Sequence, residues 1–146
     1  MASKQAQEIL GLEYDWLVSD ADGHVAIFST AGGGHAPEEF LRDTDRHDAA
    51  IDEILALPAS TTARFAPDSD PEDSSTWRLA AERGLFAFDS DYHGGPYRRV
   101  AAPVRPIHMS ELPGHAAEVV RSLRLPRVRF AESALVSRET IAEQTA

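Results

Sequence analysis

The stretch that most limits how this chain can fold covers residues 14–30 and reads YDWLVSDADGHVAIFST. Its two apolar arms, WLV and VAIF, contain the β-branched and aromatic side chains that favour a pleated, buried surface. Between the arms stands DADG, whose short carboxylates can accept nearby backbone N–H groups and whose glycine can take the positive φ of a tight reversal. The stretch predicts a β-hairpin of two central strands, packed on both faces.

The remaining segments predict an α+β domain. A helix is expected over residues 37–57, because Pro37 suits a first helical turn, Pro58 ends the helix, and apolar residues recur at three-and-four spacing. A second strand pair is expected in LFAFDSDYHGGPYRRVAAPV, residues 85–104. Short helices are expected at residues 76–83, after Ser110 and around Ile141, and a last strand at residues 127–130.

Together these elements predict one globular domain, residues 1–146, with a mainly antiparallel sheet of about four to six strands. One long helix and two or three short ones would pack on that sheet. Residues 59–75 are rich in Ser, Pro and acid, and predict an exposed acidic loop.

Composition excludes several classes of protein. The chain has no cysteine, so neither a disulfide framework nor a thiolate site is available. No basic segment followed by an apolar run opens the chain, and nowhere do about 18 apolar residues follow one another, so we expect a cytoplasmic protein without a membrane span. The net charge of −10 opposes nucleic-acid binding. Residues 97–130 are the exception, with 7 basic and 2 acidic side chains, and either balance the charge internally or form a binding face.

The turn Asp20-Ala21-Asp22-Gly23 also resembles the Asp-x-Asp-Gly motif of haloacid-dehalogenase-type phosphotransferases. That resemblance implies a Mg²⁺-dependent hydrolase in which Asp20 is the nucleophile and Asp22 the general acid and base. It also implies a later lysine, but the chain's one lysine, Lys4, precedes the motif. Turn residues remain the leading interpretation, and the hydrolase is the alternative.

Other motifs predict no cofactor or metal site. The triple glycine at residues 32–34 lacks the Gly-Lys-Ser/Thr of a phosphate cradle and is followed by two glutamates. The six histidines are scattered, with no pair at helical spacing. No G-x-S-x-G motif is present.

What remains is an acidic surface with aromatic residues beside predicted turns. Such a surface suits rapid, specific binding of a basic partner. The candidate partner-binding residues are Asp68, Asp70, Glu72, Asp73, Trp77 and Tyr92.

Two segments, DWLVSDADGHVAIFSTAGGGHAPEEF and RGLFAFDSDYHGGPYRRVAAP with the following HMSELP, resemble a group of small uncharacterised bacterial proteins. The resemblance covers residues 14–57 and 84–113 and implies that the chain is similar to polymorphic-toxin immunity proteins. It transfers no catalytic residue. We therefore expect a non-enzymatic binding protein that neutralises a basic bacterial toxin domain by occluding its site. A structural subunit or small-ligand binder is a further alternative, and the oligomeric state stays open.

Overall fold

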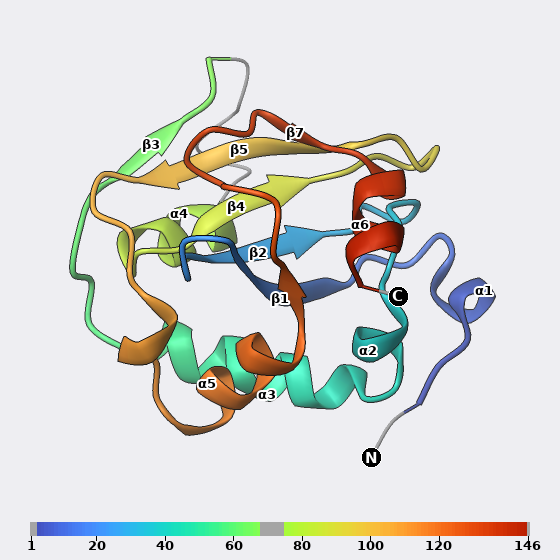
Figure 1. Ribbon diagram of the computed structural model, residues 1–146, viewed down its shortest axis with the longest axis horizontal. Helices are drawn as coiled ribbons and strands as arrows, with labels where there is room; N and C mark the ends of the chain where they lie inside the picture. Colours follow the sequence, from blue (N-terminus) through green and yellow to red (C-terminus); the bar gives the residue numbers. More distant parts are fainter. Residues whose placement is uncertain (1–2, 68–74, 146) are drawn as a thin grey trace.

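The computed structural model describes residues 3–67 and 75–145 and is built on a seven-stranded mixed sheet (Figure 1). The strands are β1 (Asp15–Asp20), β2 (Val25–Ser29), β3 (Ala63–Phe65), β4 (Phe86–Asp89), β5 (Tyr97–Pro103), β6 (Arg124–Leu125) and β7 (Leu135–Val136). Their order across the sheet is β3-β5-β4-β2-β1-β6, and β7 also pairs with β5.

The predicted hairpin is confirmed and lies near the middle of the sheet. β1 and β2 pair antiparallel, with registers from Asp15 opposite Ser29 to Ser19 opposite Val25. Because successive side chains of a strand point to opposite faces, Trp16 and Val18 enter one core and Leu17 enters the other. All three side chains are fully buried, so the hairpin is covered on both faces as its sequence indicated.

The expectation of a mainly antiparallel sheet of four to six strands is wrong in two respects. β2 pairs parallel with β4, and β1 pairs parallel with β6, so the sheet is mixed. Parallel neighbouring strands need a crossover connection. Between β2 and β4 the chain forms helices and the short strand β3 before it returns to pair with β2. Short strands β3 and β7 raise the count, because both add to the same edge of β5.

Different segments cover the two faces of the sheet. Helices α3 (Thr44–Leu55), α4 (Ser75–Glu82) and α5 (Gly114–Ser122) pack on the Leu17 face. The C-terminal segment and helix α6 (Arg138–Gln144) cover the Trp16 face, where the ring of Phe130 packs at a tilt against those of Phe28, Phe86 and Phe88. None of the helices in the described ranges is long and apolar enough to cross a membrane.

The single helix expected over residues 37–57 is two helices, α2 (Glu38–Leu41) and α3. The chain breaks at Asp43, whose carboxylate accepts the backbone N–H of Arg46 at 3.2 Å and so caps α3. The apolar spacing that predicted this helix faces the core, since Phe40, His47 and Ile54 are buried, while Leu55 is partly buried. With α1 (Ala6–Ile9) and the 3₁₀ turn η1 (Met109–Glu111), the described chain has more short helices than the two or three expected.

Residues 127–130 do not form the expected strand. The N–H of Val128 bonds to the carbonyl of Leu125, and that of Phe130 bonds to the carboxylate of Asp20, so neither N–H joins a strand ladder. β6 and β7 flank this segment instead. The expected loop over residues 59–75 contains β3, which pairs with the edge of β5.

Candidate functional site

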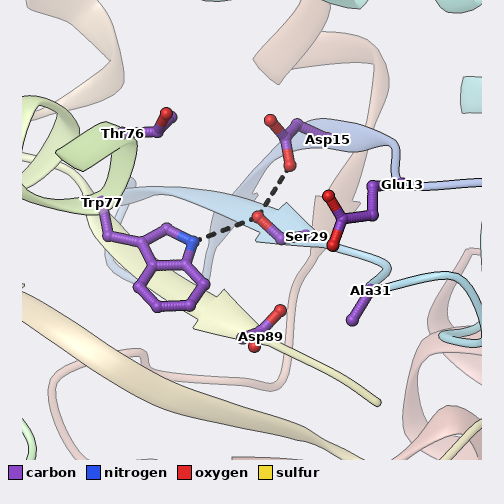
Figure 2. Close-up of a pocket in the computed structure, with 7 residues that line it drawn as sticks. All are labelled: Glu13, Asp15, Ser29, Ala31, Thr76, Trp77 and Asp89. Carbon is purple, nitrogen blue, oxygen red and sulfur yellow. Dashed lines mark hydrogen bonds between the residues drawn. The ribbon is translucent and has the colours of Figure 1, made fainter. Parts of the chain in front are cut away.

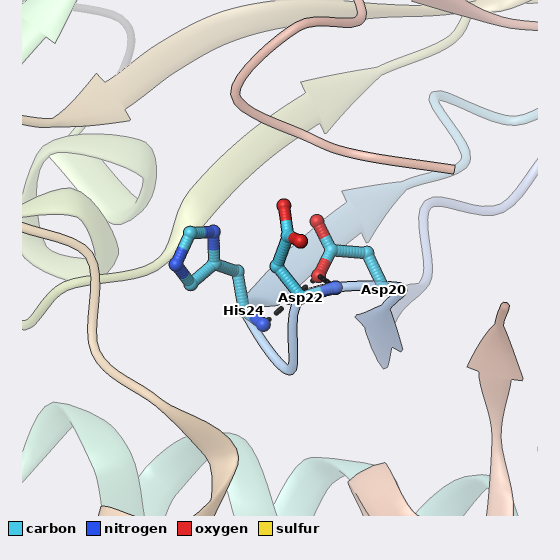
Figure 3. A group of neighbouring side chains, drawn as sticks. All are labelled: Asp20, Asp22 and His24. Carbon is cyan, nitrogen blue, oxygen red and sulfur yellow. Dashed lines mark hydrogen bonds between the residues drawn. The ribbon is translucent and has the colours of Figure 1, made fainter. Parts of the chain in front are cut away.

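The carboxylate of Asp20 accepts the hydrogen bonds that hold the tip of the hairpin in place (Figure 3). One carboxylate oxygen, Oδ1, accepts the N–H groups of Asp22 and His24, each at 2.9 Å. The other, Oδ2, accepts the N–H of Phe130 at 2.7 Å. Asp20 is fully buried. Its three hydrogen bonds to backbone N–H groups hold the turn, as the sequence predicted.

The other predicted site residues lie apart from that turn. Trp77, in the first turn of α4, is partly buried and lines a pocket at the opposite end of β1 and β2. Tyr92 is 71% exposed. Asp68, Asp70, Glu72 and Asp73 lie outside the described residues.

The pocket beside Trp77 has a volume of about 370 Å³ and is built by three adjacent strands (Figure 2). Asp15 begins β1, Ser29 ends β2 and Asp89 ends β4, and strand pairing puts them side by side: Asp15 opposite Ser29, and Ser29 opposite Asp89. Paired residues point to the same face of a sheet. Three strands therefore place two carboxylates and a hydroxyl at one end of the Leu17 face.

The loops beside these strands complete the pocket. Glu13 precedes β1 and adds a third carboxylate, and Ala31 follows β2. Ala31 has a φ of 53°, a left-handed conformation that costs a non-glycine residue roughly 1 kcal/mol. Thr76 and Trp77 come from α4. Figure 2 shows the carboxylates of Glu13, Asp15 and Asp89 around one opening, with the indole at its side.

A short chain of hydrogen bonds fixes the indole. Trp77 Nε1 donates to Ser29 Oγ at 3.2 Å, and Ser29 Oγ donates to Asp15 Oδ1 at 2.7 Å. Because the indole N–H is held by Ser29, the ring has a defined position beside the acids. Only Asp15 among the three acids receives one of these bonds.

The acids repel one another. The pKa of Asp89 is raised to about 6, chiefly by burial and then by the charges of Glu13 and Asp15, while Arg98 and the Ser90 N–H act in the opposite direction. Burial also raises the pKa of Asp15, with a contribution from Glu13 that the Ser29 hydrogen bond opposes. Within residues 3–67 and 75–145, no basic side chain forms an ion pair with these three carboxylates. Three carboxylates therefore share this opening, and Arg98, opposite Asp89 on β5, is the cation that offsets part of their charge.

Exposed apolar side chains lie next to the pocket. Leu10 and Leu12 are 66% and 53% exposed, and Leu12 directly precedes Glu13. A Cβ at Gly32 would lie close to both the ring of Tyr92 and the backbone of Gly11, and the Gly11 N–H donates to the Gly32 carbonyl at 2.7 Å. The segment around residues 10–13, the loop at residues 31–32 and Tyr92 are thus neighbours, and we call the exposed side chains of Leu10, Leu12 and Tyr92 the apolar rim.

No protein-family model matches the chain, and no curated protein or solved structure is similar enough to it to give a match. Function is therefore inferred from the chemistry of the pocket.

Three pocket acids, Glu13, Asp15 and Asp89, were not among the predicted partner-binding residues. The available signal was that Asp15 opens one apolar strand and Asp89 closes another. Using that signal requires the β2–β4 pairing, which the sequence did not reveal.

Proposed function

We propose that this chain is a non-enzymatic binding protein that receives a basic side chain of a protein partner in the pocket formed by Glu13, Asp15, Asp89 and Trp77. The biological form we propose is an immunity-type protein, which neutralises a cognate bacterial toxin by occluding its basic site. The observation that carries the proposal is the group of three carboxylates that share a pocket without a described ion-pair partner.

A bound cation would relieve the cost of that arrangement. Like charges that are partly removed from water raise each other's pKa, and an opposite charge reverses the effect. A guanidinium fits the lining better than an ammonium, because it can bond two carboxylates through its planar fork and stack on an indole. Asp15 and Asp89 would pair with the guanidinium, and Trp77 would pack against it.

The apolar rim favours a protein partner over a free small molecule. Protein interfaces combine a central anchored residue with surrounding contacts that exclude water. Leu10, Leu12 and Tyr92 offer such contacts beside the pocket. In this proposal Tyr92 contacts the partner, which is the role expected from the sequence.

The hydrolase alternative gains no support from the geometry. A nucleophile needs an open approach to the phosphoryl group, whereas Asp20 is fully buried and its carboxylate accepts three backbone N–H groups.

A fluorescence titration with acetyl-arginine amide tests the pocket directly. Trp77 lines the pocket, while the other tryptophan, Trp16, is fully buried in the core. We expect saturable quenching that is weakened about tenfold in Asp89→Asn, a loss of about 1.4 kcal/mol. The exposed, charge-matched control Asp52→Asn should bind as the wild type does, and acetyl-glutamine amide should not compete. Equal binding by Asp89→Asn and wild type would contradict the assignment of the pocket.

A toxin encoded beside this gene is the natural partner to test. We expect the two proteins to bind, with an association rate that falls as salt screens the acidic surface. We expect protection of cells against the toxin to be reduced by Asp89→Asn and unaffected by Asp52→Asn. If the purified toxin and this protein do not bind, the immunity role is wrong even where the pocket takes arginine.

A further inference from the structure

A second cluster lies at the other end of β1, where the hairpin turns. Asp20, Asp22 and His24 each offer one ligand atom, and the three atoms lie within 4.8 Å of one another (Figure 3). Among the described residues, His24 Nδ1 is the buried side-chain nitrogen or oxygen that has no hydrogen-bond partner. A buried polar atom without a partner costs about 1–3 kcal/mol, so its presence calls for a physical reason.

We propose that Asp20, Asp22 and His24 bind a divalent transition-metal ion at this turn. The site is independent of the pocket at Trp77, because no residue is shared and the two lie at opposite ends of β1.

Lone pairs are available on all three ligands. Asp20 Oδ1 uses both of its lone pairs on two N–H groups, but Oδ2 accepts only the N–H of Phe130 and keeps one. Asp22 is exposed and its carboxylate lies 3.7 Å from Arg129 Nε, an ion pair that is readily displaced at the surface. His24 contributes the unpartnered Nδ1.

The turn that carries the ligands is held from both sides. Gly23 has a φ of +76°, which suits glycine, and a side chain at this position would collide with the ring of His108. The N–H of Met109 donates to the carbonyl of Gly23 at 2.7 Å. The N–H groups that bond to Asp20 orient its carboxylate, as outer-shell donors do around metal ligands. The backbone of the turn therefore needs little reordering when an ion binds.

The ligand set indicates which ions fit. Imidazole with two carboxylates suits Zn²⁺ or Mn²⁺, whereas Mg²⁺ and Ca²⁺ prefer oxygen ligands alone. Zinc ligands stand about 3.3 Å apart in a tetrahedral site with bonds of about 2.0–2.1 Å. The three ligand atoms here lie within 4.8 Å of one another, so an ion would draw them closer, and the exposed Asp22 side chain has the most freedom to move. Water would fill the remaining positions on the Asp22 side, which is the exposed side of the cluster.

The test is a calorimetric titration of the protein with Zn²⁺ in a buffer that does not bind metal, repeated with Co²⁺ to record the visible spectrum of a nitrogen-ligated ion. We expect one ion per chain, with binding weakened at least tenfold in Asp22→Asn and in His24→Phe, which keeps a ring against Phe86. His93→Gln, in an exposed turn, is the matched control and should bind as the wild type does. Arg129→Gln should bind several times more tightly, because it removes the competing cation.

Three results would overturn the proposal: no Zn²⁺ binding by the wild type, unchanged binding in Asp22→Asn, or Ca²⁺ binding tighter than Zn²⁺. Asp22 is exposed, so Asp22→Asn remains informative if His24→Phe does not fold.

Discussion

Neutralising Asp89 should make the folded protein more stable at neutral pH. The carboxyl titrates at about 6 in the folded protein, against an ordinary value of 3.8, because it is partly buried beside Glu13 and Asp15. A raised pKa means that the folded state keeps a proton which the unfolded state has released. The resulting cost is absent below about pH 3.8, grows as the pH rises, and is fully present above about pH 6.

The size of the effect follows from the shift. About two pK units correspond to about 3 kcal/mol, at about 1.4 kcal/mol per unit. Because Asp89 is only half-buried, solvent screening reduces this to about 1 kcal/mol. Asn keeps an oxygen that can accept the Ser90 N–H, so the substitution removes charge without removing that contact. A gain of about 1 kcal/mol corresponds to a rise in Tm of about 3 °C for a chain of this size.

Urea denaturation of wild type and Asp89→Asn at pH 5, 6 and 7.5 measures the effect. We expect the difference in unfolding free energy to increase with pH and to level off above about pH 6.5. Asp52→Asn makes the same charge change on the exposed surface of α3 and should show little difference. If Asp89→Asn is no more stable than wild type at pH 7.5, the negative charge of the pocket acids is already compensated in the folded protein. The reasoning behind the cation site then fails.

Four further substitutions test how the chain packs around the site and elsewhere. His47 Nδ1 accepts the N–H of Leu17 at 3.0 Å, and burial lowers the pKa of His47 to about 4, so its contribution of about 3 kcal/mol should be lost as the pH falls from 6.5 through 4. His47→Ala should therefore flatten stability against pH in urea titrations over that range. Tyr97→Phe should cost about 1–2 kcal/mol by the same assay, because the hydroxyl donates to the His35 carbonyl and accepts from Trp16 Nε1. Gly34→Ala should lower Tm by several degrees, since its Cβ would meet Tyr97 and Ser90, whereas Gly114→Ala, whose Cβ would make only ordinary contacts with Glu53 at the start of α5, should raise it slightly.

Local chemistry was sufficient to predict the hairpin. Apolar arms on either side of an Asp-Gly turn fix both the strands and their reversal within one short stretch, and the structure agrees residue by residue. The same holds for α4, which ends before Gly84 with a φ of +93°, and for the β4–β5 pair. Each of these depends on neighbours in sequence, and turn residues carry that information.

Pairings between distant segments could not be predicted in the same way. β4 joins β2 in parallel after the chain has passed through α2, α3, β3 and α4, and no local pattern encodes that return. Residues 127–130 show the converse error, since their alternation is typical of a strand but the N–H of Phe130 is taken by a carboxylate far away in sequence. The split of the long helix at Asp43 was readable, because Asp is a preferred N-cap residue.

The two ends of β1 show why residue type alone did not locate the site. Both ends carry aspartate, and the sequence drew attention to Asp20 because it stands in a recognisable motif. Yet Asp20 accepts three backbone N–H groups, whereas Asp15 receives one hydroxyl and faces two other carboxylates. The N–H groups fix the orientation of the Asp20 carboxylate, whereas carboxylates that face one another raise each other's pKa, and a basic side chain placed between them relieves that repulsion. Strand register decides which case applies, so the pocket of three carboxylates could be found only once β1, β2 and β4 were placed side by side.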